Sequence, residues 1–217
     1  MRAFLRASGQ VFLTIGVVIA LFIAYLFWGS GLRAAQAQGQ FAAQLEHAWQ
    51  EPYGPGGRMP ADPIRLVTGE PFAFIRIPAF GAHWRFTVIQ GTALAQLDVS
   101  PGHVPGTQLP GQVGNFAVAG HRVTAGNPFW SLPSLTVGDR VFIDTRYATY
   151  TYRVIGKPVW VLPTDLAVLD RVPGHPGVTP TRRLITLITC DPAWTGTHRV
   201  IVTGVLIAVS PRTGGHA

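Results

Sequence analysis

The longest hydrophobic feature of the chain is an uncharged apolar run near its N-terminus, Val11 to Trp28. A helix rises ~1.5 Å per residue, so this run is ~27 Å long, close to the ~30 Å hydrocarbon core of a bilayer. Arg2 and Arg6 precede the run, and positive charge on the short N-terminal side favours a cytoplasmic N-terminus. The pattern predicts a cytoplasmic segment over residues 1–10, a transmembrane anchor over 11–28 and an extracytoplasmic remainder.

A cleaved signal peptide is the alternative interpretation of this run. Ala35-Gln36-Ala37 is a small-residue sequence of the kind that signal peptidases cut. However, the apolar run is longer than the ~7–15 residues of a secretory hydrophobic region, which favours the anchor.

Residues 29–70 separate this run from the rest of the chain. The first part, 29–50, is rich in Ala and Gln and carries apolar residues at a spacing of four, which predicts a helical stalk. The second part, 51–70, contains recurrent Pro and Gly, which is typical of an irregular linker.

From residue 71 onward, short apolar segments alternate with turns rich in Gly and Pro, and several segments alternate polar and apolar residues. The expected strands are Phe72–Ile77, Arg85–Ile89, Phe116–Ala119, Arg140–Asp144, Tyr150–Val161, Leu184–Thr189 and Val200–Ala208. Short strands at regular spacing predict a mostly β domain, either a barrel or a sandwich, over residues 71–209.

Two segments between these strands predict short helical turns. They are Pro128–Leu135 and Thr164–Leu169, the second with Thr164 as its N-cap. The final segment, residues 210–217, is expected to be a flexible tail.

Composition indicates the kind of fold, and the distribution of charge argues against nucleic-acid binding. The chain contains 25 Gly and 18 Pro, which favours strands and turns over long helices. Its formal net charge is +7, but the basic residues are scattered, so no nucleic-acid-binding stripe is supported. Attraction to an anionic membrane or wall surface and an ordinary solvated, Arg-biased surface are both compatible with this charge.

The candidate chemistry centres on Cys190, the single cysteine of the chain. A lone cysteine cannot form a disulfide within the chain, and it ends the apolar segment 184–189. One interpretation is a small buried hydrophobic side chain. The other is a nucleophile, which requires a nearby positive charge because the thiolate is the reactive form.

His121 and Arg199 are the candidate partners, since each lies at the end of an expected strand. The histidine suits an acid/base role, and the permanently charged arginine suits stabilisation of an oxyanion. If the segments 184–189 and 200–208 pair as neighbouring strands, Cys190 and Arg199 meet at one end of the sheet. The spacing alone does not place His121 beside them.

Two sequence segments resemble sortases. Thr186-Leu187-Ile188-Thr189-Cys190, followed by Arg199, is similar to the TLxTC…R signature of this family. The stretch from Gly102 to Arg122, which contains Gly120-His121, resembles the segment that carries the catalytic histidine in class D and class E members. The similarity covers 72–208, and the Cys190-Asp191-Pro192 loop favours class E over class D.

The resemblance implies a closed sortase-type β-barrel with one or two short helices after the N-terminal transmembrane helix. It implies a membrane-anchored transpeptidase that cuts a C-terminal LPxTG-like or LAxTG-like sorting signal between Thr and Gly. The secreted protein would then pass, through a cysteine thioester, to an amine of a lipid-linked cell-wall precursor or of a pilin subunit. No cofactor is expected, and nucleic acid is not an expected partner.

Carried over by position, the resemblance makes Cys190 the nucleophile, His121 the acid/base and Arg199 the clamp for substrate and oxyanion. Thr189, His103 and Val104 would contribute to substrate binding, and the segment 164–183 would recognise the sorting signal. Relatives often have an aromatic residue where this chain has Val104, so the resemblance leaves the detailed substrate preference open.

Three alternatives remain at this point. A zinc site formed by His103, His121 and Cys190 lacks compact ligand spacing. An L,D-transpeptidase-like enzyme would carry histidine and glycine shortly before the nucleophile, where this chain has Ile188-Thr189. A non-catalytic, membrane-tethered domain that binds peptides or wall polymer would be expected to lack one of the three catalytic residues, and all three are present.

Overall fold

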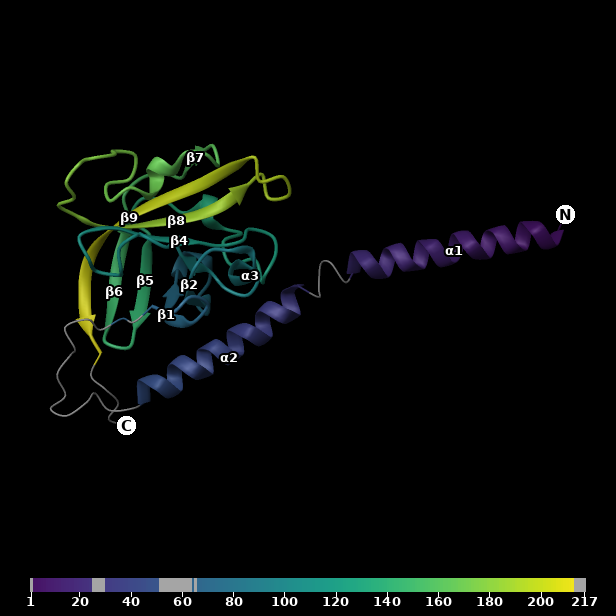
Figure 1. The fold of residues 1–217 in the computed structure, drawn as a ribbon, viewed down its shortest axis with the longest axis horizontal. Helices are drawn as coiled ribbons and strands as arrows, with labels where there is room; N and C mark the ends of the chain where they lie inside the picture. The colour runs from purple at the N-terminus through teal and green to yellow at the C-terminus, as the bar shows by residue number, and fades with distance from the viewer. Residues whose placement is uncertain (1, 25–29, 51–63, 65, 213–217) are drawn as a thin grey trace.

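The computed structural model describes residues 2–24, 30–50, 64 and 66–212, and Figure 1 shows their arrangement. Two helices come first, α1 (Arg2–Ala24) and α2 (Ser30–Gln50). Within the described part of the chain, no helix reaches the combination of length and hydropathy that a membrane span requires. The predicted anchor, 11–28, extends into residues 25–28, which lie outside the described residues.

Nine strands follow among the described residues. They are β1 (Pro71–Arg76), β2 (Arg85–Gln90), β3 (Gly102–His103), β4 (Gly114–Ala119), β5 (Arg140–Thr145), β6 (Ala148–Val154), β7 (Val159–Val161), β8 (Arg183–Asp191) and β9 (His198–Pro211). The pairing order is β6-β5-β1-β2-β3-β4-β8-β9, and β9 pairs back to β6. This closure makes a barrel, and β7 adds a short ninth strand to β9.

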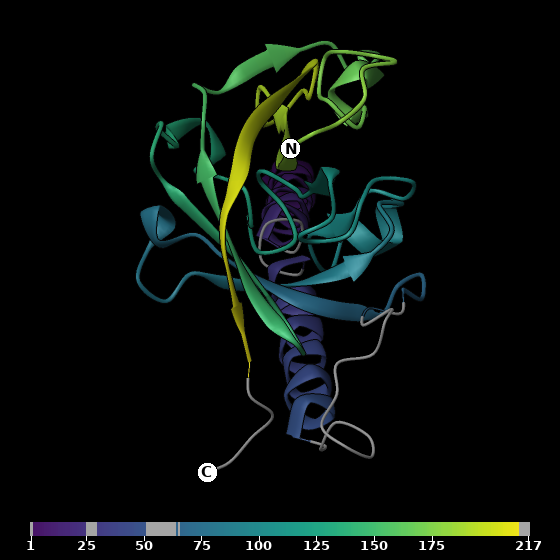
Figure 2. The ribbon, with the colours of Figure 1, turned by 90° about the vertical axis from the view of Figure 1, so that its left-hand side faces the viewer.

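The long strand β9 closes the barrel because it serves two partners in succession. Its first half pairs with β8 and β7, and its second half pairs with β6. In Figure 2, β9 is drawn in yellow and passes from the β7 end of the molecule to the side of β6. A closed ring leaves few unpaired backbone groups, which suits a chain of short strands.

The barrel interior is filled by the inward-facing side chains of these strands. Phe116 and Val118 from β4, Ile185 and Leu187 from β8, and Val202 from β9 are all at most 1 % exposed. The strands β4 and β8 run parallel and lie side by side, so their ends with higher residue numbers meet at one end of the barrel. This end carries the candidate functional residues.

Four short helical elements lie between the strands: η2 (Pro78–Phe80), α3 (Leu94–Leu97), η3 (Leu132–Ser134) and η4 (Leu166–Leu169). The turns predicted near residues 128–135 and 164–169 are therefore present. Thr164 is not the N-cap of the second turn: Asp165 is the cap, and its carboxylate accepts a hydrogen bond from the backbone N–H of Ala167.

Two sequence-based boundaries differ from the structure. The expected strand 150–161 is two strands, β6 and β7, because Gly156 and Pro158 interrupt it. The strand β9 continues through Pro211, which pairs with Ala148, so it enters the expected tail. Residues 213–217 lie outside the described residues.

The helix α2 packs on the barrel rather than standing clear of it as a stalk. Ala34 and Leu45 are buried, and the ring of Trp49 meets the ring of Phe74 edge-on with centroids 5.2 Å apart. The side-chain amide of Gln38 accepts a hydrogen bond from the Thr87 N–H at 2.8 Å and donates one to the Val99 carbonyl at 3.0 Å. These contacts fix the helix against β2 and the loop that follows α3.

Candidate active site

The strands β8 and β9 bring the candidate nucleophile and the candidate oxyanion clamp together. Cys190 on β8 pairs directly with Arg199 on β9, as the sequence predicted. The Arg199 guanidinium donates hydrogen bonds from Nη1 to the carbonyls of Gly196 at 2.8 Å and His198 at 3.0 Å. Gly196 lies in the β8–β9 connection and His198 is the first residue of β9, so these carbonyls hold the arginine at the strand end where the thiol lies.

Gly196 lies against both residues and was not identified from the sequence. A Cβ atom added to it would lie 3.7 Å from Cys190 Sγ and 3.8 Å from Arg199 Nη1. Its φ of +60° is in the left-handed region, which glycine adopts without strain. Glycine therefore allows this loop to approach the thiol closely.

The parallel pairing of β4 with β8 places His121 at the same end of the barrel. Ala119 pairs with Ile188, and the next residue, Gly120, donates its N–H to the Ile188 carbonyl at 3.0 Å. If this register is continued by two further residues beyond β4, it sets His121 opposite Cys190, and paired strands are ~4.8 Å apart. The barrel thus joins three residues that are distant in the sequence.

Asp98 is an additional group at this site. Its Oδ1 lies 3.3 Å from Nε2 of His121, and it follows the short helix α3. The His121 carbonyl accepts a hydrogen bond from the Phe129 N–H at 3.1 Å, which closes the following turn on the histidine. Nothing in the sequence identifies Asp98, because it lies 23 residues upstream in a segment without a motif.

The Asp191 side chain, next to the candidate nucleophile, links three neighbouring elements through an ion pair and a hydrogen bond. Its Oδ1 forms an ion pair with Nη1 of Arg122, the residue after His121. Its Oδ2 accepts a hydrogen bond from Trp160 Nε1 on β7 at 2.8 Å. The carboxylate therefore positions the ends of β4, β8 and β7 relative to one another. Its partners among the described residues are Arg122 and Trp160, and neither of these is the His121 imidazole.

The predicted substrate-binding residues lie in different environments. Thr189 is 2 % exposed, and its hydroxyl donates to the Gly120 carbonyl at 2.8 Å, so it links β8 to β4. Val104 is half-buried, and its N–H donates to the Ala117 carbonyl at 2.9 Å. The structure does not bring the Thr189 side chain to the surface, where a bound peptide would lie.

His103 is also enclosed, at 1 % exposed, between the rings of Phe116 and Phe72. Its Nδ1 lies 2.6 Å from Gln90 Oε1, and its Nε2 lies 3.0 Å from the Thr107 hydroxyl. Burial lowers the pKa of this imidazole, which favours the neutral ring. A direct contact with substrate is therefore not supported for His103, and its ring instead joins β2 to the turn after β3.

The described residues contain no cluster of three His, Cys, Asp or Glu side chains that could hold a metal ion. The zinc alternative has no support in this part of the chain, because the ring nitrogens of His103 face Gln90 and Thr107 in the barrel wall.

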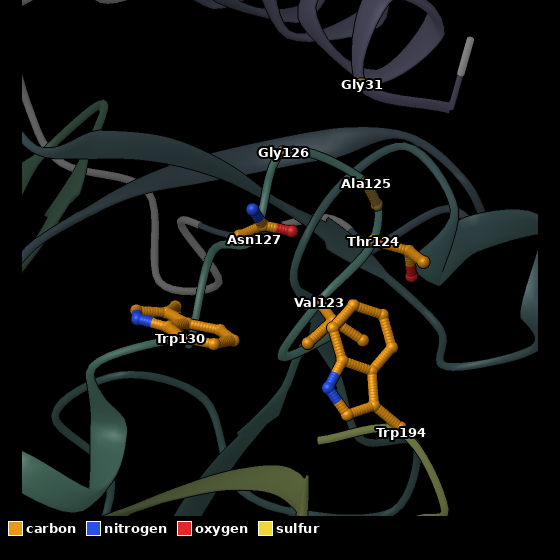
Figure 3. Close-up of a pocket in the computed structure, with 8 residues that line it drawn as sticks. All are labelled: Gly31, Val123, Thr124, Ala125, Gly126, Asn127, Trp130 and Trp194. Carbon is orange, nitrogen blue, oxygen red and sulfur yellow. The ribbon is translucent and has the colours of Figure 1, made fainter. Parts of the chain in front are cut away.

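Two surface features lie on elements that neighbour the candidate catalytic residues in the fold or along the chain. One follows β7 and η4 and exposes the apolar side chains of Val159, Trp160, Leu162, Leu166 and Val178. The other is a hollow of about 360 Å³ between the turn that follows His121 and the loop that follows Cys190 (Figure 3).

Comparison with known proteins gives a consistent result. The sortase domain model matches residues 75–207. Sortase SrtE1 of Streptomyces coelicolor is 32 % identical over 97 % of this chain, and the chain spans 59 % of the length of that relative.

Two solved structures share the fold at similar identity. Sortase E from Streptomyces avermitilis is 39 % identical with a TM-score of 0.63, over 70 % of this chain and 97 % of that one. Sortase E1 from Streptomyces coelicolor with a tripeptide in the active site is 31 % identical with a TM-score of 0.62, over 70 % and 98 %. The chain therefore belongs to the sortase family, whose members are cysteine transpeptidases, and its similar relatives include class E sortases.

Proposed function

We propose that this chain is a membrane-anchored transpeptidase. It cuts a C-terminal sorting signal and transfers the part of the substrate protein on the N-terminal side of the cut to an amine. The observation that carries the proposal is the direct pairing of Cys190 with Arg199, with His121 two residues after the end of the adjacent parallel strand β4. Nucleophile, fixed positive charge and acid/base group are the parts that acyl transfer requires.

The first half-reaction follows from these three groups. The Cys190 thiolate attacks the carbonyl carbon of the threonine in the signal, and the Arg199 guanidinium stabilises the resulting oxyanion. The bond between the threonine carbonyl carbon and the glycine nitrogen then breaks, and His121 donates a proton to the departing amine. The product is a thioester between Cys190 and the threonine carbonyl.

The second half-reaction regenerates the enzyme. An amine of the acceptor attacks the thioester carbonyl carbon, and His121 accepts the proton that the amine loses. The carbon–sulfur bond breaks, Cys190 leaves as a thiolate, and a new amide bond joins the sorted protein to the acceptor. The expected acceptor is a lipid-linked cell-wall precursor, and no cofactor takes part in either half-reaction.

The exposed apolar surface along β7 suits the sorting signal. Trp160, Leu162 and Leu166 are each at least 50 % exposed, and the Trp160 indole donates a hydrogen bond to Asp191, the residue after Cys190. A short extended peptide with leucine and proline or alanine side chains would bury these groups on binding. The tripeptide in the active site of sortase E1 from Streptomyces coelicolor supports a peptide ligand for this site.

The apolar run 11–28 supports the proposed anchoring, with the N-terminus in the cytoplasm and the barrel outside. Along α1 the side chains of Phe12, Leu13 and Leu21 are at least 65 % exposed. Exposed apolar surface of this extent is unfavourable in water and favourable in lipid. Fractionation of cells, followed by protease treatment from the outside, tests the anchoring and the orientation together.

The experiment that tests the activity uses the full chain in detergent with LPxTG and LAxTG peptides and a glycine-terminated amine. We expect cleavage between Thr and Gly and a ligated product, both lost in Cys190→Ala. His121→Ala should reduce turnover by about 10²–10⁴-fold. His83→Ala, which removes an exposed histidine outside the site, is the matched control. Failure of the wild-type chain to cut either peptide would count against this substrate class.

A further inference from the structure

A buried asparagine in the barrel wall contacts the segment that follows β7. Asn115 is the second residue of β4, and it is 0 % exposed. Phe116 and Val118 of the same strand fill the barrel interior, and successive residues of a strand point to opposite faces. Asn115 therefore lies on the outer face of β4, where its polar side chain would meet water if no other segment covered it.

The Asn115 amide joins β4 to η4 through two hydrogen bonds. Its Nδ2 donates to the carbonyl of Val168, within η4, at 3.1 Å and to the carbonyl of Asp170, the residue after η4, at 3.1 Å. Its Oδ1 accepts a hydrogen bond from the Thr186 hydroxyl on β8 at 2.7 Å. A buried amide whose donors and acceptor are all paired has one favourable orientation, so Asn115 fixes η4 relative to β4 and β8.

The backbone of Asn115 is held in place as well as its side chain. Its N–H donates to Oε1 of Gln108 at 2.8 Å, and its carbonyl accepts a hydrogen bond from the Gln108 N–H at 2.9 Å. Thr186, the third partner of the amide, is also 0 % exposed. The amide thus extends from a fixed part of the barrel wall, and η4 is the surface element whose position depends on it.

The segment that Asn115 contacts carries part of the apolar surface along β7. Leu166, two residues before Val168 in η4, is 67 % exposed, and Leu162, between β7 and η4, is 59 % exposed. A surface segment that becomes ordered only when a peptide binds loses conformational entropy, and that loss weakens binding. A segment already attached to the barrel wall avoids most of this loss.

We propose that Asn115 is a positioning residue of the sorting-signal site, and that its amide fixes η4 so that Leu166 is already in place to contact the signal. The inference rests on the proposed transpeptidase function, with the apolar surface along β7 as the peptide site. Asn115 is buried and acts through the backbone of η4, so it affects how tightly the signal binds and not the attack by Cys190. The strand β4 then supports peptide binding near its start and leads to His121 after its end.

Asn115→Asp in the full chain tests the assignment, because it keeps the size of the side chain and its acceptor oxygen but removes both N–H donors to η4. We expect the KM for the LPxTG and LAxTG peptides to rise about tenfold, with kcat at saturating peptide unchanged. Trypsin should also cut after Arg171, an exposed residue that follows η4, faster than it does in the wild-type chain.

Thr145→Val is the matched control for a loss of stability alone. It removes a buried hydroxyl that donates to the Ala148 carbonyl at 3.0 Å, in the turn between β5 and β6. This variant should have a lower Tm and an unchanged KM for the peptides. An unchanged KM in Asn115→Asp, or an equal rise in Thr145→Val, would overturn the assignment.

Hydrogen exchange in the wild-type chain provides a second test that needs no substitution. The N–H groups of Asp170 and Gly174 both donate to the Ala167 carbonyl, at 3.1 and 2.8 Å, so their exchange reports whether η4 is formed. We expect slow exchange of both amides in the free chain and little further slowing when the peptide binds. Fast exchange that becomes slow only with peptide would show that the signal itself orders η4, which contradicts the role of Asn115. Absence of peptide cleavage by the wild-type chain would instead count against the proposed function.

Discussion

Cys190 and Arg199 lie directly opposite each other on the antiparallel strands β8 and β9. The pairing is a property of the barrel wall, since the same ladder continues from Leu184 opposite Val205 to Asp191 opposite His198. The guanidinium is further fixed by the carbonyls of Gly196 and His198. A positive charge is thus held at the strand end that carries the thiol.

Substitution of Arg199 tests the need for this fixed charge. Arg199→Ala should reduce the rate of thioester formation by about 10²–10³-fold, because it removes stabilisation of the oxyanion. Arg199→Lys keeps the charge but loses the planar fork, so it should recover only part of the rate. The rates are measured with saturating peptide. Arg140→Ala, which removes an exposed arginine at the start of β5, should have no effect on the rate. Wild-type activity in Arg199→Ala would show that Arg199 takes no part in the mechanism.

Thr189→Val tests whether the residue before the nucleophile is structural. The change removes the buried hydroxyl that donates to the Gly120 carbonyl, and the lost hydrogen bond should cost about 1–3 kcal/mol in the free energy of unfolding. We expect a lower Tm and an unchanged KM for the peptide. Thr203→Val on β9, where the side chain is half-exposed, should cost less. A raised KM at unchanged Tm would instead place Thr189 in contact with substrate.

Gly120→Ala tests the close packing immediately before His121. A Cβ atom here would lie 2.8 Å from Cδ2 of Phe129, a ring that is fully buried. Either the ring or the end of β4 must move, at a cost of about 1–3 kcal/mol, and the movement displaces His121. Both Tm and turnover should fall. Gly156→Ala is the matched control, since a Cβ atom there meets nothing within 4 Å, and equal behaviour of the two variants would contradict the packing argument.

The ion pair between Arg76 and Asp144 predicts a loss of stability in acid. Arg76 Nε donates to Asp144 Oδ2 at 2.6 Å, and Thr149 donates to Asp144 Oδ1 at 2.7 Å. Burial raises the pKa of Asp144, but these hydrogen bonds and the Arg76 charge lower it by more, so its pKa in the folded state lies below the ordinary value of 3.8.

The direction in which stability changes with pH follows from this depressed pKa. The unfolded state binds a proton before the folded state does, so the contribution of Asp144 is present above pH 3.8 and is lost as the pH falls through the folded-state pKa. Asp144→Asn should lower Tm at pH 7, and the difference from wild type should shrink toward pH 2. A difference that stays constant across this range would contradict the assignment. Thermal unfolding followed by circular dichroism measures the Tm of wild type and of Asp144→Asn at each pH.

The parts of the site that could be predicted from the sequence are those that local pattern determines. The apolar segments around Cys190 and Arg199 flank a short connection, and such segments pair as an antiparallel hairpin. The position of His121 could not be derived in this way, because a parallel crossover of about 60 residues separates β4 from β8. Its placement came from family resemblance, and the register of the two strands explains it.

Two of the predicted substrate-binding residues have enclosed side chains. Thr189 and His103 were assigned to substrate binding from the family resemblance, and the structure encloses both side chains. Neighbouring residues of a strand point to opposite faces, so proximity to the nucleophile in the sequence does not give exposure. Asp98 was missed for the complementary reason that a loop brings it to His121 without any local signal in the sequence.

The most direct measurement of the central claim is the intact mass of the full chain after incubation with a sorting-signal peptide and no acceptor amine. The account predicts an added mass equal to the acyl fragment that ends in threonine, located on Cys190 by digestion and released by hydroxylamine. Cys190→Ala should show no addition. An unmodified wild-type chain that nevertheless cleaves the peptide, or an adduct elsewhere in the chain, would contradict the thioester mechanism.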